Sequence, residues 1–194
     1  MTISSSARVD ASVRIGAGTR VWDFAVVRER VEIGSDCTIG VGAYLGPGVL
    51  LGDNCRIQNH AQIFEQAVLD NNCFVGPGCV FTNDRVPRAV NLDGTRRQLG
   101  NWEPSLINVR EGASIGANVV CVGPLTIGSW ALVGSGAVVL NDVPDHALVV
   151  GSPARFVGWV GKSGNRLERD GARWRCVETG DLFVEDGHGL RISA

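Results

Sequence analysis

The chain has 194 residues, a formal net charge of −2 and a sequence pI of about 5.9. This near-neutral charge supplies no basic field for nucleic acid or for an anionic membrane surface, so we expect neither partner. The N-terminal segment lacks the apolar run of a signal peptide, and no 18 successive residues are apolar. We therefore expect a soluble, cytoplasmic protein of one main domain, with reduced cysteines.

The first part of the chain carries an apolar residue at every sixth position. The 26 glycines and few aromatic residues already favour short strands joined by tight turns, because glycine is costly inside a helix. The period of six identifies the chain as a repeat protein. The repeated residues are Ile3, Val9, Ile15, Val21, Val27, Ile33, Ile39, Leu45, Leu51, Ile57, Ile63, Leu69, Val75 and Phe81.

A small side chain, such as Ala25 or Ala61, usually lies two positions before each repeated residue. One large and one small inward side chain per six residues is typical of a narrow triangular solenoid. We expect three hexapeptides per coil and about 4.8 Å between coils. Cys37, Cys55 and Cys73 are 18 residues apart and should form a ladder of buried thiols. The six cysteines include no C-x-x-C pair, so neither a zinc ribbon nor a redox motif is indicated.

The glycine that usually follows the repeated residue is missing from one whole coil. Gln58, Phe64 and Asp70 occupy three successive corners where other coils mostly carry glycine. The repeat also predicts that Phe64 lies one coil below Thr82. We interpret this coil as the floor of an acceptor site.

A long loop interrupts the repeat within residues 82–108. Phe81 and Val109 are 28 residues apart, so about 22 residues leave the helix if they begin successive hexapeptides. The loop carries Trp102, several acidic residues and four arginines, and loops of this length are usually functional or disordered. It could grip an anion or a neighbouring subunit, or it could be a solvated decoration.

The repeat resumes at Val109 and continues to Val139, after which the pattern changes. The residues beyond 155 read as a few short strands joined by turns such as Asp170-Gly171. We predict a β-helix domain over residues 1–155. Residues 156–194 should form a small β-strand cap over the open end of the helix, because an uncovered edge invites aggregation.

The hexapeptides and the sequence "NDVPDHALVVGSPAR" resemble the left-handed parallel β-helix acyltransferases. The left-handedness is implied by this resemblance. Within that superfamily, "RIQNHAQIFEQAVLDNNCFVGPGCVFTNDRVPR", "GASIGANVVCVGPLTIGSWALVGSGAVVLNDVP" and "VGWVGKSGNRL" resemble N-acetyltransferases of nucleotide-linked 3-amino sugars. Asp23, where relatives often carry histidine, and the insert at residues 89–104 depart from that pattern.

This resemblance implies a homotrimer with active sites between adjacent helices. Each site would take acetyl-CoA and a nucleotide-linked (UDP- or dTDP-) 3-amino-dideoxy sugar. The sugar amine would attack the thioester directly, without a covalent acyl-enzyme. No metal is implied.

Three residues are candidates for the chemistry of amide formation. His60, the only histidine in the periodic region, is expected at an outward corner as a general base or a positioning group. The departing thiolate could take the proton instead. Asn83 matches the family motif, which implies a hydrogen bond to the substrate near the reacting amine. Glu65, one coil below Asn83 in the repeat, could orient the ammonium group or accept its proton, or be a solvated corner residue.

Other candidates would bind the two substrates. Arg88 matches the family's arginine after proline, and Arg85 could share its role, because a guanidinium suits sugar acids and diphosphates. Gln58, Asn59 and Phe64 complete the expected acceptor site. The resemblance places the pantetheine arm of CoA against backbone amides of the C-terminal coils. The cofactor candidates are therefore Gly116, Ala117, Gly134, Ser135, Pro153 and Arg155.

Other functions remain open for a helix of this kind. A zinc carbonic anhydrase would need three histidine ligands, but His146 and His188 lie beyond the periodic region. A non-enzymatic scaffold or ice-binding surface would show a flat outward row of one residue type, which is absent. Within the acyltransferases, the acceptor could be a 4-amino sugar, a serine or an antibiotic hydroxyl.

Overall fold

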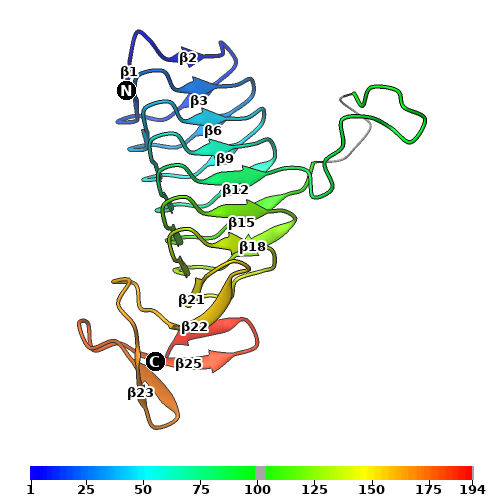
Figure 1. The fold of residues 1–194 in the computed structure, drawn as a ribbon. Coiled ribbons are helices and arrows are strands. Elements are labelled where there is room, and N and C mark those ends of the chain that lie inside the picture. Colours follow the sequence, from blue (N-terminus) through cyan, green and yellow to red (C-terminus); the bar gives the residue numbers. More distant parts are fainter. Residues whose placement is uncertain (99–103, 194) are drawn as a thin grey trace.

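The computed structural model describes residues 1–98 and 104–193 of the chain. It is a left-handed parallel β-helix of triangular cross-section with a long protruding loop and a small C-terminal β cap (Figure 1). Each coil visits three parallel sheets, which we name A, B and C in the order of the chain. We name the three edges AB, BC and CA after the sheets that they join.

Sheet A has nine strands and ends in one antiparallel pair, β21 with β22. Its strands are β1 (Thr2–Ile3), β4 (Arg20–Val21), β7 (Thr38–Ile39), β10 (Arg56–Ile57), β13 (Phe74–Val75), β16 (Ser114–Ile115), β19 (Leu132–Val133), β21 (Ala147–Val150) and β22 (Arg155–Trp159).

Sheets B and C have seven and six strands, and all their pairings are parallel. Sheet B consists of β2 (Arg8–Val9), β5 (Val26–Val27), β8 (Tyr44–Leu45), β11 (Gln62–Ile63), β14 (Val80–Thr82), β17 (Val120–Val122) and β20 (Val138–Val139). Sheet C consists of β3 (Arg14–Ile15), β6 (Glu32–Ile33), β9 (Leu50–Leu51), β12 (Ala67–Leu69), β15 (Ile107–Val109) and β18 (Leu125–Ile127).

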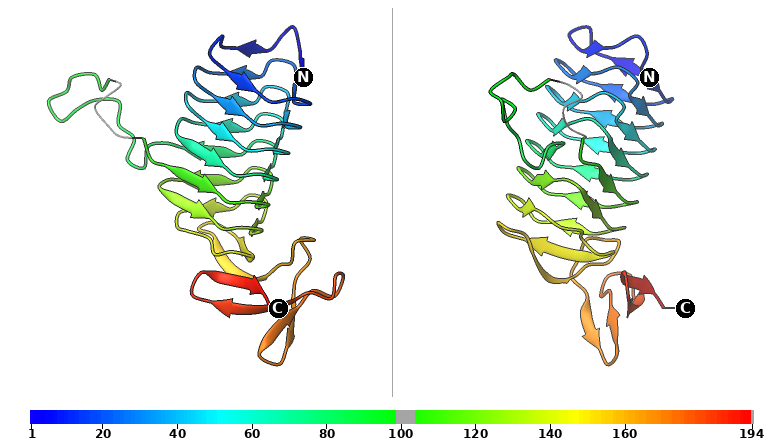
Figure 2. Two further views of the ribbon diagram at one scale, coloured as in Figure 1. Left: turned by 180° about the vertical axis from the view of Figure 1, so that it is seen from behind. Right: turned by 90° about the vertical axis from the view of Figure 1, so that its right-hand side faces the viewer.

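The strand register confirms the predicted repeat and the size of its interruption. Ile63 pairs with Phe81, 18 residues later, whereas Phe81 pairs with Cys121, 40 residues later. The difference of 22 residues is the segment that leaves the helix at the BC edge. It projects far from the side of the coils (Figures 1 and 2).

The inward residues of the repeat form one continuous core along the helix axis. Ile57, Ile63 and Phe81 are completely or almost completely buried, whereas Ile3 in the first coil is 39% exposed. Cys37, Cys55 and Cys73 are buried, as predicted, and the other three cysteines are buried as well. Burial raises the pKa of Cys79 and of Cys121, so these thiols stay protonated near neutral pH.

A four-stranded antiparallel sheet covers the C-terminal end of the helix (Figure 2). It packs around its own small core, which includes Phe183 and Cys176. His146, at the last CA corner, joins it to the helix: Nδ1 donates to the Val160 carbonyl at 2.9 Å, and the ring lies 5.0 Å from that of Phe183. The division into domains at residue 155 stays a prediction. The strands are β23 (Glu168–Asp170), β24 (Arg173–Arg175), β25 (Leu182–Asp186) and β26 (Gly189–Ile192).

In the described part of the chain, no helix has the length and apolarity needed to cross a membrane.

Candidate functional site

The BC edge of the fifth coil holds the point where the loop leaves the helix. The Ser105 N–H donates to the Asn83 carbonyl at 2.7 Å, so the loop departs and returns at one place. The Phe64 N–H donates to Phe81 at 3.3 Å, which aligns Phe64 with Thr82 as predicted. Glu65 and Asn83 follow at the same edge on successive coils, and both are half-buried. An amide and a carboxylate therefore flank the base of the loop.

The hydroxyl of Thr82, next to Asn83, is buried and has no hydrogen-bond partner among the described residues. A buried hydroxyl without a partner costs free energy, and such groups are rare in folded proteins. The sequence gives no signal for this feature, because Thr82 occupies an ordinary corner position.

Gln58, Asn59 and His60 lie together at the AB edge of the coil below. The Asn59 Oδ1 accepts the Val41 N–H at 2.9 Å, so the corner itself uses this oxygen. His60 is exposed and its backbone is left-handed, with φ of 59°. Its ring lies over Gly42, where an added Cβ would be 2.6 Å from Nδ1. A glycine on the coil below thus makes room for the imidazole.

A single chain does not bring all the predicted catalytic residues together. His60 is at the AB edge and Asn83 is at the BC edge, and sheet B separates these edges. Glu65 and Phe64 lie on the same edge as Asn83. The candidates therefore fall into two groups on two edges of the prism.

The loop forms a hairpin that we call the arm, described over residues 84–98. Val90 and Arg96 form an antiparallel bridge, and the Arg97 N–H donates to Ala89 at 3.1 Å. At the hairpin turn, the Asn91 N–H donates to Thr95 at 2.8 Å. Local polar bonds shape this arm, while hydrophobic periodicity shapes the helix.

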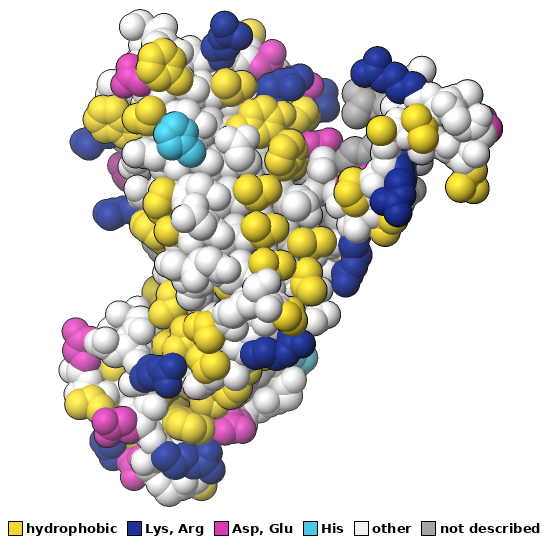
Figure 3. Space-filling model, in the orientation of Figure 1, with side chains coloured by type: hydrophobic (Ala, Val, Ile, Leu, Met, Phe, Trp, Pro, Cys, Tyr) yellow, Lys and Arg dark blue, Asp and Glu magenta, His cyan; other side chains and the backbone are white. Residues whose placement is uncertain are grey.

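The arm carries most of its charge as arginines (Figure 3). Arg97 pairs with Asp84 at 3.6 Å and donates to the Val86 carbonyl, which ties the arm to its base. Arg85 and Arg88 are exposed, as an anion-binding role requires. Trp102, which the sequence also singles out, lies outside the described residues.

Four of the cofactor candidates line the AB edge in the C-terminal coils. The Ala117 N–H donates to Ser135 Oγ at 3.1 Å, so these residues contact each other. The N–H groups of Gly116 and Gly134 each donate at 2.8 Å within sheet A. Those two amides are therefore satisfied by the fold itself, and a ligand at this edge would contact other atoms.

Arg155, by contrast, lines a pocket of about 220 Å³ at the end of the last coil, together with Phe156 and Asp142. Pro153, in the turn before Arg155, is exposed. Arg155 therefore contributes a cationic side chain to the lining of this pocket.

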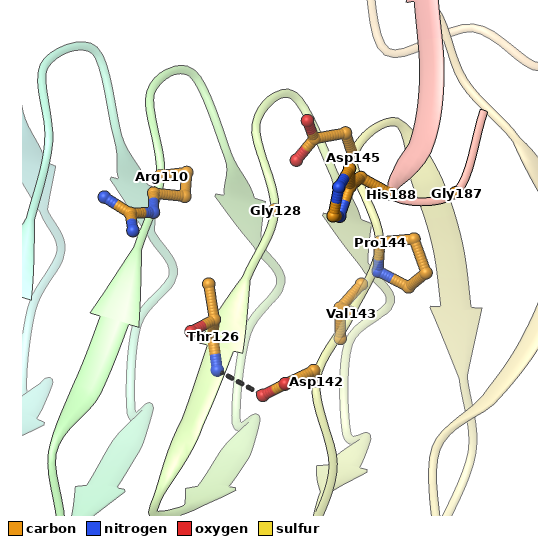
Figure 4. A pocket seen from close by; sticks show the side chains of 9 residues that line it. All are labelled: Arg110, Thr126, Gly128, Asp142, Val143, Pro144, Asp145, Gly187 and His188. Atoms are coloured by element: carbon orange, nitrogen blue, oxygen red, sulfur yellow. Dashed lines mark hydrogen bonds between the residues drawn. The ribbon is translucent and has the colours of Figure 1, made fainter. Parts of the chain in front are cut away.

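A pocket of about 500 Å³ was not anticipated from the sequence (Figure 4). It lies between sheet C, the CA edge and the cap, and includes Arg110, Asp145 and His188. Asp142, which accepts the Thr126 N–H at 2.7 Å, lines it as well. Docking of the cap turn against the helix creates this hollow, and such docking leaves no periodic signal in the sequence.

No group of three His, Cys, Asp or Glu side chains that could hold a metal occurs among the described residues.

The family described as "Bacterial transferase hexapeptide (six repeats)" matches residues 12–47 and 30–65. A dTDP-3-amino-3,6-dideoxy-alpha-D-galactopyranose 3-N-acetyltransferase of Aneurinibacillus thermoaerophilus is 50% identical over 60 residues, 31% of each chain. A serine acetyltransferase of Haemophilus influenzae is 32% identical over 136 residues, 69% of this chain and 45% of the relative. The chain spans less than half the length of these relatives.

Two solved structures share the fold. The acetyltransferase domain of PglB from Neisseria gonorrhoeae, in complex with acetyl coenzyme A, has a TM-score of 0.53 and 23% identity, covering 80% of this chain and 56% of that chain. AntD, an N-acyltransferase from Bacillus cereus in complex with dTDP and Coenzyme A, has a TM-score of 0.52 and 21% identity, covering 83% and 82%. Residues 12–65 thus match the repeat of bacterial hexapeptide transferases, and the same six-residue period continues through the coils that the structure describes.

Proposed function

We propose that the protein is an acetyl-CoA-dependent N-acetyltransferase for a nucleotide-linked (UDP- or dTDP-) 3-amino-dideoxy sugar. The observation that carries this proposal is the BC edge, where Asn83 and Glu65 stand at the base of an arm with exposed arginines. An amide and a carboxylate suit an amine, and guanidinium groups suit a diphosphate. The 50% identity to a 3-N-acetyltransferase over 60 residues supports the same substrate class.

In the proposed reaction, the unprotonated sugar amine attacks the carbonyl carbon of the acetyl thioester. A C–N bond forms, the C–S bond breaks, and CoA leaves as a thiolate. Asn83 would orient the amine through its side-chain amide, and Glu65 would hold the ammonium form before attack. The amine proton passes to His60 or to the departing thiolate, so proton and charge balance in either case.

We further propose that the protein works as a homotrimer. His60 and four of the cofactor candidates lie at the AB edge, whereas Asn83 and the arm lie at the BC edge. A neighbouring copy that brings its AB edge against this BC edge would complete each site, with CoA between the copies and Arg155 near its phosphates. The two structural neighbours bind acetyl-CoA and CoA, which supports a CoA site on this fold. Six free cysteines support the predicted cytoplasmic location.

A thiol-release assay with acetyl-CoA tests the substrate class. The panel should contain nucleotide-linked 3-amino and 4-amino sugars, L-serine and a simple alcohol, with a reaction lacking acceptor as the blank. We expect the fastest release with a 3-amino sugar. Failure with every amino sugar together with turnover of serine or the alcohol would overturn the proposal.

Serine acetylation is the second candidate, because the serine acetyltransferase match covers 69% of this chain. A serine acceptor needs no diphosphate recognition, so the arginines of the arm would then be dispensable. Charge neutralisation of Arg85 and Arg88 to glutamine separates the two functions. It should weaken turnover of a nucleotide sugar about tenfold or more and leave serine turnover unchanged.

A further inference from the structure

Two aromatic side chains lie below the loop on the side of the BC edge. Tyr44 is on strand β8 of sheet B, and Phe64 is the next corner residue on the following coil. Their ring centroids are 5.5 Å apart with an interplanar angle of 52°, and both side chains are half-buried. The pair is therefore a fixed aromatic surface that solvent or a ligand can reach.

In the corner column that contains Phe64, the position one coil earlier is Gly46, and that coil contacts the ring through Tyr44. Gly46 precedes Phe64 in this column and has no side chain to cover the ring. A Cβ at position 46 would lie 3.0 Å from the Phe64 backbone carbon and 2.7 Å from the Glu65 nitrogen, which makes glycine necessary there. An outward phenylalanine beside a glycine corner is accessible to a ligand, unlike a residue of the core. We call the pair of Tyr44 and Phe64 the ledge.

Arg28 stands at the corner one coil below Gly46. Its Nε donates to Glu29 at 3.0 Å, and its side chain is 46% exposed. The Glu29 carboxylate, followed by the neighbouring Tyr44, raises the pKa of Arg28, so the guanidinium stays charged next to the aromatic pair. Because Glu29 balances this charge locally, Arg28 suits a base edge better than a diphosphate, for which the exposed Arg85 and Arg88 are better placed.

We propose that Tyr44, Phe64 and Arg28 form the subsite for the planar base of the nucleoside diphosphate on the acceptor. This inference rests on the proposed function. It assigns a binding site to the nucleotide base, which is the end of the substrate opposite the reacting amine. Three coil spacings, on the order of 14 Å, separate the corners of Arg28 and Thr82. A nucleoside diphosphate whose amino sugar reaches Asn83 can span such a distance.

Stacking on an aromatic side chain tolerates any base, because every base has a π-face. The ledge therefore predicts recognition of the base as a ring, with the guanidinium of Arg28 donating to a base carbonyl at its edge. Phe64 then occupies a glycine position for a reason: it supplies the ring that a glycine corner lacks.

Calorimetric titration of the full-length protein with UDP, dTDP and inorganic diphosphate tests this subsite. Phe64→Leu and Tyr44→Leu should each weaken binding of the preferred nucleoside diphosphate about tenfold or more, and leave diphosphate and acetyl-CoA binding within about twofold. Phe64→Tyr, which keeps a ring, should retain wild-type affinity. Phe74→Leu is the matched control, because Phe74 is also an outward, half-buried phenylalanine but lies on sheet A.

The outcomes separate this inference from the function on which it rests. If the wild type acetylates an amino sugar and both leucine variants bind the nucleoside diphosphate normally, the subsite is overturned and the function stands. If the wild type binds neither UDP nor dTDP and acetylates no amino sugar, the proposed function fails as well. Equal losses in Phe64→Leu and Phe74→Leu would show a general packing defect and would also overturn the subsite.

Discussion

Asn83 has two separate roles at the residue scale. Its backbone carbonyl accepts the Ser105 N–H and closes the base of the arm, while its side-chain amide is the proposed ligand of the reacting amine. A side-chain substitution therefore leaves the closing hydrogen bond in place. This separation makes Asn83 a cleaner probe of the chemistry than a residue whose side chain holds the fold.

Asn83→Ala should lower kcat by about 10²–10³-fold, the usual loss when an oriented polar group at the reacting centre is removed. Glu65→Ala should lower kcat clearly less, because in the proposed reaction the carboxylate holds the amine only before attack. Thiol-release kinetics with the best amino sugar measure both values. A kcat for Asn83→Ala within about threefold of wild type would contradict the assignment.

The glycine beneath His60 offers a way to move the imidazole without removing it. Gly42→Ala would place a Cβ 2.6 Å from His60 Nδ1, whereas Gly48→Ala meets no atom within 4 Å although its φ of 69° is close to the 64° of Gly42. Both variants should lose about 1 kcal/mol of unfolding free energy from backbone strain. Only Gly42→Ala should change kcat, and equal kcat in the two variants would show that the imidazole position is unimportant.

His146 makes the junction with the cap sensitive to acid. Burial lowers the pKa of His146 below its ordinary value of 6.5, so the folded state keeps the ring neutral. Below about pH 6.5 the unfolded state binds more protons than the folded state. The free energy of unfolding therefore falls as the pH drops.

Thermal melts between about pH 8 and about pH 5 should show this dependence. His146→Asn, which suits the left-handed backbone (φ 62°), should lower Tm near pH 8 and flatten the acid slope. His188→Gln is the control, because His188 is an exposed histidine of the cap. An unchanged acid slope in His146→Asn would exclude this residue as its source.

At the scale of elements, the arm is an insertion at one corner of the fifth coil. The coils before and after it pair in unbroken register, and the arm begins and ends at one hydrogen bond of 2.7 Å. The strands themselves are mostly two residues long, so their stability comes from stacking between coils. Residues 84–98 of the arm contribute no fully buried side chain to this stack.

Replacing residues 84–104 with a short Gly-Ser link should therefore change Tm by only a few degrees, since Asn83 and Ser105 already meet. Acetyl transfer to a nucleotide sugar should fall about 100-fold or more, because Arg85 and Arg88, which we propose hold the diphosphate, are removed. Acetyl-CoA binding, measured in parallel, should be unchanged. Full acetyl transfer by the shortened protein would remove the arm from the mechanism.

The six-residue period predicted the inward residues, the 18-residue register and the 22-residue interruption, because each depends on one repeated geometric rule. The alignment of Phe64 with Thr82 followed from the same rule. The hairpin of the arm did not follow, because pairs such as Val90 with Arg96 obey no repeat. The pocket around Arg110 and His188 was also missed, since it depends on how the cap docks.

At the scale of the whole molecule, the candidate residues lie on two edges that face different directions. One chain cannot close a site that needs both His60 and Asn83 at the same amine. The proposed homotrimer solves this geometric problem, because a heterologous contact repeats around a threefold axis and joins unlike edges. Each copy would then serve one site with its AB edge and the next site with its BC edge.

Complementation between two inactive variants tests this arrangement. Asn83→Ala removes a BC-edge group, and Ser135→Trp should block the proposed CoA path at the AB edge. Random mixed trimers should regain about a quarter of the wild-type rate, since one site in four draws both intact edges. The readout is thiol release after co-expression, with light scattering to show a mass about three times 20.6 kDa.

Each variant expressed alone serves as the control and should stay inactive. Mixed preparations without recovered activity, despite a trimeric mass, would indicate that each chain builds its own site.

Because Asn83 and Ser105 close the arm at its base, the helix and the arm are under different sequence constraints. The hydrogen bonds between coils constrain each residue of the helix, because a shift of one position would turn the inward side chains to the outer face. The 22-residue insertion obeys only an end condition: its two termini must meet at one corner. The proposed acceptor recognition could therefore be changed by exchanging a whole arm, while the helix that carries it stays the same.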